Sequence, residues 1–289
     1  MKNDHADIAI VAANYNNGKY LKEFIESILS SSIIPSQVII VDDGSVDESI
    51  HVLKEYEKLP IACFIYSEKN EGFAIALNKG LAAVKTKYVM RADPDDILYP
   101  SKIESQLHFL ENNPQICAVG CNVEYFHNGS DKILNKSNFP LTVEDINTTY
   151  LKGEHGLQHP TVLIRSDAIK EYRYRQEYVP AEDYDLFSRL IERGYQFMNI
   201  SDALYKMRIH ETSASTNIRF DTIKKTFELR EKIFKKKTSL FKIKMYFYYI
   251  LNYRRYLIEK NIIKKVIFLG ISIFCYPNKL IKRVFIWQH

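Results

Sequence analysis

Three carboxylates follow one another closely in MRADPDDILYP, where Asp93, Asp95 and Asp96 come just after an apolar segment. Such a run is typical either of a solvated acidic turn or of a cation site. An EF-hand is excluded, because its fifth position falls on Ile97 and its required glycine on Leu98. What remains is an incomplete oxygen site, suited to Mg²⁺ or Mn²⁺ completed by waters and substrate phosphates.

Two further acidic pairs have both a structural and a chemical interpretation. Asp42 and Asp43 form a good turn and helix cap, but a carboxylate at the end of a strand can also accept the N–H of a nucleobase. Glu182 and Asp183 are typical of a helix start, where they complement the helix dipole. Beside a metal and other acids, one of them could instead act as a general base.

Basic and imidazole side chains offer weaker signals. His159 precedes Pro160 and is more typical of a loop or core histidine than of a catalytic one. Arg208 and His210, in KMRIHETSAS, are either structural or able to offer positive charge to a diphosphate.

The elements that must position these groups alternate along the first hundred residues. Short β-branched runs are each followed by a stretch with helical periodicity, and they predict strands over 7–14, 37–43, 61–66 and 87–93. This alternation indicates an α/β fold with a mainly parallel sheet and helices on both faces. Ligands of such sheets bind beyond the carboxyl ends of the strands, so Asn14, Asp42, Asp43 and Asp93 should converge on one crevice.

Later segments are less regular. A strand is predicted over 116–126, an apolar segment over 159–165, a helix over 181–194, and basic, aromatic helices from Asp221 onward. The chain contains neither GxGxxG nor GxxxxGK[ST], so neither glycine-rich phosphate loop is available, and a metal is the expected substitute.

Composition places the chain among ordinary globular proteins, with 289 residues of which 46% are hydrophobic. The four cysteines match neither a zinc knuckle nor a CxxC pair, which favours reduced thiols in the cytoplasm. The N-terminus has no signal-peptide pattern, and the longest apolar run, 266–276, is too short to cross a bilayer. We expect a cytoplasmic protein, with a peripheral position on the cytoplasmic face of the inner membrane as a further option.

Charge is distributed unevenly. Residues 221–289 carry 17 Lys or Arg against 4 Asp or Glu, a net charge of +13. Because the whole chain has a formal charge of +5, residues 1–220 carry a net charge of −8. This basic tail either packs on the body or binds an anionic membrane surface, and its interleaved Phe, Tyr and Trp side chains favour the membrane. Nucleic acid is another partner for such charge, but it is not expected here.

Six ordered segments resemble the inverting glycosyltransferases of family 2, which have the GT-A fold and include bacterial enzymes of surface-polysaccharide assembly. They are VAANYNNGKYL, VIIVDDGSVDES, NEGFAIALNKG, YVMRADPDDILYPSKIESQ, HPTVLIR and AEDYDLFSRL, followed by RIHETSAS. The resemblance implies a GT-A catalytic domain over 1–220, with a nucleotide-sugar half (1–115) and an acceptor half (116–220). Residues 221–289 then form a helical basic tail.

The resemblance also implies roles for single residues. Asp95, with Asp93, would bind Mn²⁺ or Mg²⁺, while Asp96 supports the loop. Asp183 would deprotonate the acceptor hydroxyl, and Glu182 would help to orient it. The implied nucleotide-sugar-binding set is Ala13, Asn14, Tyr15, Asp42, Asp43, Asn70, Gly72, Arg91, Asp93, His159, Arg208 and His210.

The sequence therefore predicts a metal-dependent inverting transferase of a hexosyl or N-acetylhexosaminyl group. The donor would be a nucleotide sugar, preferably UDP-linked, and the acceptor a saccharide carried on a lipid, as in O-antigen or capsule biosynthesis. Two rival interpretations remain. A sugar nucleotidyltransferase would need a glycine-rich loop that AANYNNGKYL does not supply, and a non-catalytic scaffold of glycan assembly would need no full set of acids.

Overall fold

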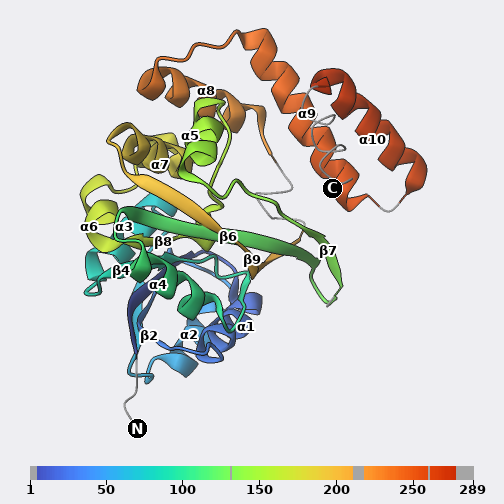
Figure 1. The fold of residues 1–289 in the computed structure, drawn as a ribbon. Helices are drawn as coiled ribbons and strands as arrows, with labels where there is room; N and C mark the ends of the chain where they lie inside the picture. The colour runs from blue at the N-terminus through green and yellow to red at the C-terminus, as the bar shows by residue number, and fades with distance from the viewer. Residues whose placement is uncertain (1–4, 131, 211–217, 260, 278–289) are drawn as a thin grey trace.

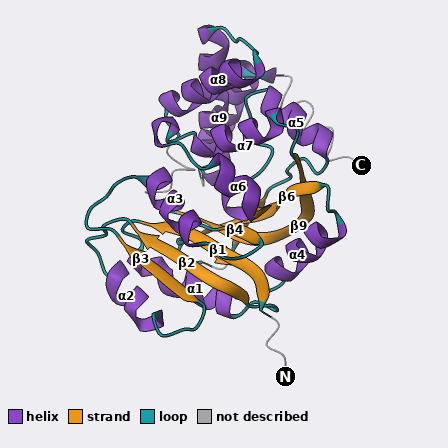
Figure 2. Cartoon of the chain, turned by 90° about the vertical axis from the view of Figure 1, so that its left-hand side faces the viewer, coloured by secondary structure: helices purple, strands orange, loops and turns teal. Residues whose placement is uncertain are grey.

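The computed structural model describes residues 5–130, 132–210, 218–259 and 261–277. Its centre is a sheet in the strand order β3-β2-β1-β4-β8-β6-β9-β5, with β7 added on β6 (Figure 1). Helices cover both faces of this sheet, and a group of C-terminal helices extends away from it (Figure 2). The expected α/β fold class is confirmed.

The first half of the sheet is parallel, as the alternating pattern predicts. Its strands are β1 (Ala6–Asn14), β2 (Pro35–Asp42), β3 (Ala62–Tyr66) and β4 (Tyr88–Arg91). The register pairs Asn14 with Asp42 and Val11 with Arg91, so the carboxyl ends of three neighbouring strands reach the same edge. The polar residues that follow these strands are therefore held close together.

The second half of the sheet is mixed, which the sequence did not predict. Strand β8 (Leu163–Arg165) runs antiparallel to both β4 and β6 (Ile116–His127), and β6 lies parallel to β9 (Gln196–Ile209). Strand β5 (Ile97–Leu98) pairs antiparallel with β9, and β7 (Ile133–Lys136) with β6. Strand β9 thereby reaches the loop that carries the three aspartates.

Two apolar clusters, one on each face, hold the helices to the sheet. Helices α1 (Gly18–Leu29), α2 (Ser49–Tyr56) and α4 (Lys102–Asn112) contribute Leu21, Leu53 and Ile103, respectively, to the first cluster. Fully burying a side chain of this size stabilises the fold by ~1.5–3 kcal/mol. The second cluster is formed with α3 (Phe73–Ala83), α5 (Val143–Leu151), α6 (Ser166–Tyr172) and α7 (Glu182–Glu192).

The predicted helix over 181–194 is confirmed as α7, and Gly194 follows it with a φ of +86°. Single 3₁₀ turns, η1 (His159–Thr161) and η2 (Gln176–Tyr178), flank β8 and α7. The last family segment, RIHETSAS, is described only as far as His210, and its remainder lies outside the described residues.

The expected C-terminal helices are present as α8 (Phe220–Phe234), α9 (Leu240–Ile258) and α10 (Ile262–Cys275). A separate apolar cluster joins them, built on Ile223, Phe227, Ile243, Tyr246 and Tyr249. In the described part of the chain, every helix is too short or too polar to span a bilayer. The four cysteines are free thiols.

Candidate active site

The end of β1 and the end of β2 are joined by a buried polar network. The Asn14 side-chain amide donates to Asp42 Oδ2 at 2.7 Å and to Ser45 Oγ at 3.2 Å. Asp42 Oδ1 accepts from the Ser45 backbone N–H at 2.9 Å. Asn14 and Asp42 are both fully buried, so their hydrogen bonds fix the shape of the loop after β2.

Asp43 joins this loop to the start of α3. Its two carboxylate oxygens accept the backbone N–H groups of Glu71 and Gly72, at 3.0 and 2.9 Å. A carboxylate has about four acceptor positions, so each oxygen retains a free lone pair. Gly72 has a φ of +110°, and a Cβ there would lie 2.4 Å from Gln176 Nε2, so this position requires glycine.

The other predicted donor residues surround this loop at different depths. Ala13 is buried at the end of β1, whereas the Tyr15 side chain is 47% exposed and Asn70 is exposed on the loop before α3. The fold thus brings these predicted residues to the same edge of the sheet, where Tyr15 and Asn70 are exposed.

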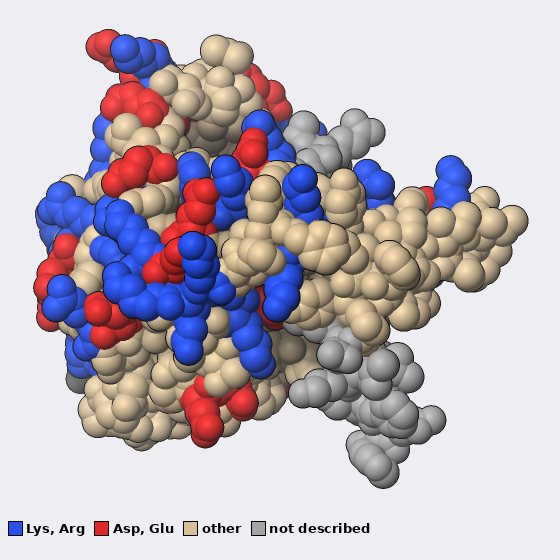
Figure 3. All heavy atoms as spheres, turned by 90° about the horizontal axis from the view of Figure 1, so that it is seen from above, with Lys and Arg blue, Asp and Glu red and all other residues tan. Residues whose placement is uncertain are grey.

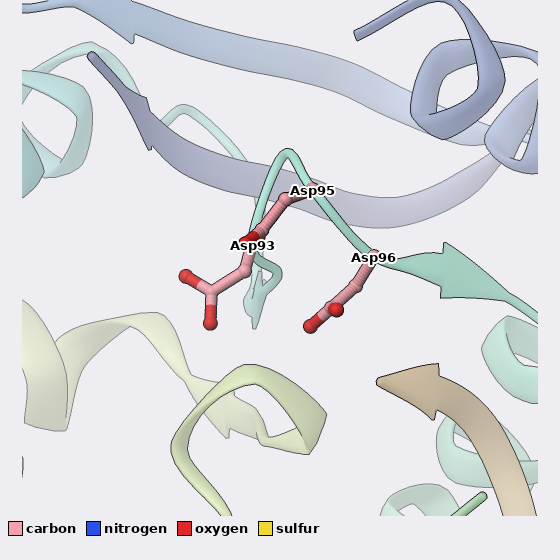
Figure 4. Close-up of side chains that lie close together, drawn as sticks. All are labelled: Asp93, Asp95 and Asp96. Atoms are coloured by element: carbon pink, nitrogen blue, oxygen red, sulfur yellow. The ribbon is translucent and has the colours of Figure 1, made fainter. Parts of the chain in front are cut away.

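The loop between β4 and β5 carries the three aspartates (Figure 4). One carboxylate oxygen of each of Asp93, Asp95 and Asp96 lies within 4.8 Å of the others. The carboxylates of Asp93 and Asp96 point to the same side of the loop in Figure 4. Three converging carboxylate oxygens fit a hard divalent cation such as Mg²⁺ or Mn²⁺.

Strand β9 holds this loop in place through two residues. The Asp93 backbone N–H donates to the Tyr205 hydroxyl at 2.9 Å. Arg208 donates its backbone N–H to Asp96 Oδ1 at 2.7 Å and its Nε–H to the Asp95 carbonyl at 2.8 Å. Asp96 therefore supports the loop, as expected, and also turns one oxygen toward its two neighbours. The sequence did not identify Tyr205, because an apolar strand pattern does not distinguish it from a core tyrosine.

Crowding of like charges perturbs the acids of this loop. Burial, with the neighbouring Asp95 and Asp93 charges, raises the pKa of Asp96 well above its usual range. The pKa of Asp93 is also raised, by burial and by Asp95, although the Arg91 guanidinium donates to its Oδ1 and opposes the rise. A bound divalent cation would stabilise the ionised form of each group.

The two basic residues predicted to meet a diphosphate contact the aspartate loop. His210 Nε2 lies 2.9 Å from Asp95 Oδ2. The buried Arg208 guanidinium lies between the Tyr20 and Phe126 rings and donates to Asn128 and Glu23. The described contacts of Arg208 therefore position the loop, whereas His210 sits directly beside a candidate metal ligand.

The second acidic pair lies at the N-terminus of α7. Asp183 Oδ1 accepts the Tyr184 backbone N–H at 2.7 Å, and Oδ2 lies 3.3 Å from His155 Nδ1. Burial acts to raise the pKa of Asp183, but the charge and hydrogen bond of His155, with the Tyr184 backbone N–H, outweigh it and hold that pKa well below its usual range. Asp183 is therefore ionised at neutral pH and able to accept a proton.

Glu182 behaves differently from its neighbour. Burial, together with the Asp183 charge, raises the pKa of Glu182 to about 7. Its Oε2 is buried and has no hydrogen-bond partner among the described residues. Two adjacent carboxylates with opposite shifts are a pattern typical of acid–base sites.

The sequence also missed His155, because the irregular segment around it gave no pattern. Burial lowers its pKa, but the Asp183 carboxylate reverses this effect and makes the net shift upward. His159, in contrast, is buried among aromatic rings, with Nε2 2.7 Å from the Tyr174 hydroxyl. Burial and the Arg91 charge lower the pKa of His159 to about 3, so it is neutral, as a core histidine would be.

Asp183 and Asp93 lie near enough in the fold for their charges to interact, although about ninety residues separate them in the sequence. The Asp183 charge contributes to the raised pKa of Asp93, and the Arg91 charge acts on Glu182. The structure thus joins a candidate cation site, a candidate base and the polar loop after β2 at the carboxyl edge of one sheet.

This fold and site define a glycosyltransferase of the GT-A type. The model of Glycosyl transferase family 2 matches residues 9–173, and the chain belongs to this family. An uncharacterized glycosyltransferase of Methanocaldococcus jannaschii is 31% identical over 205 residues, which cover 70% of each chain. The amylovoran biosynthesis glycosyltransferase AmsE of Erwinia amylovora is 28% identical over 225 residues, covering 76% of this chain and 83% of AmsE.

Solved structures resemble the fold at low identity. TarS of S. aureus in complex with UDP-GlcNAc superposes with a TM-score of 0.63 at 18% identity, covering 94% of this chain and 82% of that one. The mannosyltransferase PcManGT of Pyrobaculum calidifontis, in complex with GDP-Man and Mn²⁺, gives a TM-score of 0.60 at 16% identity, covering 92% and 74%. Both structures support the GT-A fold.

Proposed function

We propose that this glycosyltransferase transfers a hexosyl or N-acetylhexosaminyl group from a nucleotide sugar, preferably UDP-linked, with inversion at the anomeric carbon. The observation that supports the proposal is an ionised Asp183 near enough for its charge to act on Asp93, which belongs to the oxygen cluster of Asp93, Asp95 and Asp96. One group accepts a proton and the other anchors a diphosphate, which are the two requirements of a direct displacement.

The donor base binds beside the loop after β2. Asp43 accepts the N–H of the base through the lone pairs that the Glu71 and Gly72 amides leave free, while Asn14 and Asp42 hold the loop. Tyr15, exposed at the rim, packs against the base. The UDP-GlcNAc in TarS supports a uridine nucleotide, whereas the GDP-Man in PcManGT keeps guanosine as the comparison to test.

Asp183 takes the proton of the acceptor hydroxyl as that oxygen attacks the anomeric carbon, and the diphosphate leaves from the opposite face. Attack opposite the leaving group inverts the configuration. His155 positions the Asp183 carboxylate through a contact with Asp183 Oδ2. Glu182 orients the acceptor. Arg91 lies next to Asp93 and adds positive charge on the leaving-group side.

Asp95 and Asp93 are the residues that would hold Mn²⁺ or Mg²⁺, with an oxygen of Asp96 and His210 Nε2 close by. A bound divalent cation would neutralise the charge that develops on the leaving diphosphate. The Mn²⁺ in PcManGT supports this choice of cofactor.

The acceptor is proposed to be a saccharide carried on a lipid, in the assembly of a bacterial surface polysaccharide. Support comes from the names of relatives, which include AmsE and the minor teichoic acid biosynthesis protein GgaB of Bacillus subtilis. In this proposal the catalytic domain spans residues 1–220, with a donor half at 1–115 and an acceptor half at 116–220. The C-terminal region, residues 221–289, associates with the cytoplasmic face of the membrane.

The test is a screen of UDP-, GDP- and dTDP-sugars with Mn²⁺, following nucleotide release by the native protein and by Asp183→Asn. We expect release from UDP-sugars to fall at least ~100-fold in the variant, while donor binding is retained, because only the base is lost. Equal release by both proteins would remove Asp183 from the mechanism. Failure of the native protein to bind any donor would instead favour a non-catalytic scaffold.

A further inference from the structure

We propose that the outward face of α10 is a lipid-binding surface that seats the enzyme on an anionic bilayer. The proposal deepens the membrane association suggested above by naming the surface. It rests on the proposed function in one respect, namely that the acceptor is carried on a lipid. The feature behind it is a helix whose outer side is almost entirely apolar and faces solvent.

Apart from Lys264, the exposed side chains of α10 are aliphatic or aromatic. Ile263 is 69% exposed and Phe274 is 81% exposed. The opposite side of α10 packs on α9 through Leu269 and the buried Ser272, whose hydroxyl donates to the Tyr249 carbonyl. Apolar patches of this kind mark interaction sites. Other exposed apolar residues of this helix are Ile262, Val266, Ile267, Ile271 and Ile273.

The position of the helix fits a flat partner. Helices α9 and α10 project from the body, and α10 lies at the outside of the pair (Figure 1). Seen from above, the projecting part is largely uncharged, with a few Lys and Arg side chains at its edge, unlike the mixed charges over the rest of that face (Figure 3). A convex apolar helix can insert into the interfacial region of a bilayer without a matching groove.

Charge distinguishes a lipid surface from a second copy of the chain. Helices α9 and α10 contain no acidic residue and six basic ones, of which Arg254 is drawn inward and the others are Lys242, Lys244, Arg255, Lys264 and Lys265. A symmetric contact between two copies would bring these like charges together, which is unfavourable. Anionic headgroups provide the complementary charge, because Lys and Arg side chains near a bilayer are attracted to its negative surface potential.

The same arrangement connects the membrane with the reaction. The Arg254 charge on α9 acts on His155, the partner of the proposed base, so α9 lies close to the acceptor side of the site. For a lipid-linked acceptor, a bilayer under α10 would present that acceptor from the side of the C-terminal helices.

The experiment is vesicle flotation of the full-length protein with phosphatidylglycerol-containing and with pure phosphatidylcholine vesicles. The test variant is Ile263→Glu with Phe274→Glu. The matched control is Leu141→Glu with Leu151→Glu, which adds the same charge at two exposed apolar sites of the body. We expect the α10 variant to lose anionic-vesicle binding by at least ~10-fold and the control to bind as the native protein does.

Any one of several results would overturn the proposal. These are a native protein that remains unbound to anionic vesicles, an α10 variant that floats as well as the control, and a dimer in lipid-free light scattering that the α10 substitutions dissociate. A large loss of thermal stability in the α10 variant would also overturn it, because the face would then be covered by the chain itself. UDP binding in solution, measured on the same proteins, separates failure of this inference from failure of the proposed function.

Discussion

Replacing Glu182 by glutamine should change how the stability of the protein depends on pH. The pKa of Glu182 is raised from 4.5 to about 7, chiefly because the carboxyl is buried and next to Asp183. Between these values the folded protein binds a proton that the unfolded chain releases, so the native state loses stability as pH rises through this window. The Glu182→Gln variant has no titrating proton at this position, so its stability should not fall for this reason as the pH rises.

The size of the effect follows from the shift. At ~1.4 kcal/mol per pH unit, burial of Glu182 costs the folded state about 3 kcal/mol once the group is ionised, and most of this cost develops between about pH 5 and about pH 8. Urea unfolding at these two pH values, followed by circular dichroism, gives the free energy of unfolding for both proteins. We expect Glu182→Gln to lose roughly 2–3 kcal/mol less than the native protein over this interval.

The control is Glu192→Gln at the other end of α7, where the carboxylate is exposed. Its stability should follow the native pH dependence. If Glu182→Gln also ran parallel to the native protein, the carboxyl would not be held in its neutral form by burial, and the electrostatic description of the α7 N-terminus would be refuted.

Two other substitutions test the support of the site. Arg208→Lys should leave the fold intact but raise the Mn²⁺ concentration needed for half-maximal activity ~10-fold. The reason is that one lysine side chain cannot donate hydrogen bonds to the Asp95 carbonyl and to Asn128 at the same time. An unchanged Mn²⁺ requirement would argue against a positioning role for Arg208. His155→Asn should raise the pKa of Asp183 and move the acid limb of the kcat/KM profile to higher pH; a shift toward lower pH would contradict the pairing.

The parallel half of the sheet could be predicted from the sequence because each strand is a short β-branched run followed by an amphipathic helix. That pattern, with the rule that ligands gather at carboxyl strand ends, also predicted that Asn14, Asp42 and Asp93 lie together. The antiparallel insertion of β8 could not be predicted, because three residues, Leu163–Arg165, are too few to show a periodicity.

The residues that hold the acidic side chains in place were harder to predict from the sequence than the acidic residues themselves. Tyr205 and Arg208 hold the aspartate loop from more than a hundred residues away, through backbone groups that have no sequence signature. His155 contacts Asp183 from an irregular segment. The sequence left Arg208 as either a structural residue or a positive charge for a diphosphate, and its burial and its hydrogen bond to the aspartate loop favour the structural role.

The central claim is that Asp95 belongs to a cation site that holds the diphosphate of a nucleotide. The most direct measurement is calorimetric titration of UDP into the native protein and Asp95→Asn, each with and without Mn²⁺, with Glu111→Gln, an exposed acid of α4, as control. We predict that Mn²⁺ strengthens UDP binding at least ~10-fold in the native and control proteins and has no effect in Asp95→Asn. Equal strengthening by Mn²⁺ in all three proteins would contradict the claim.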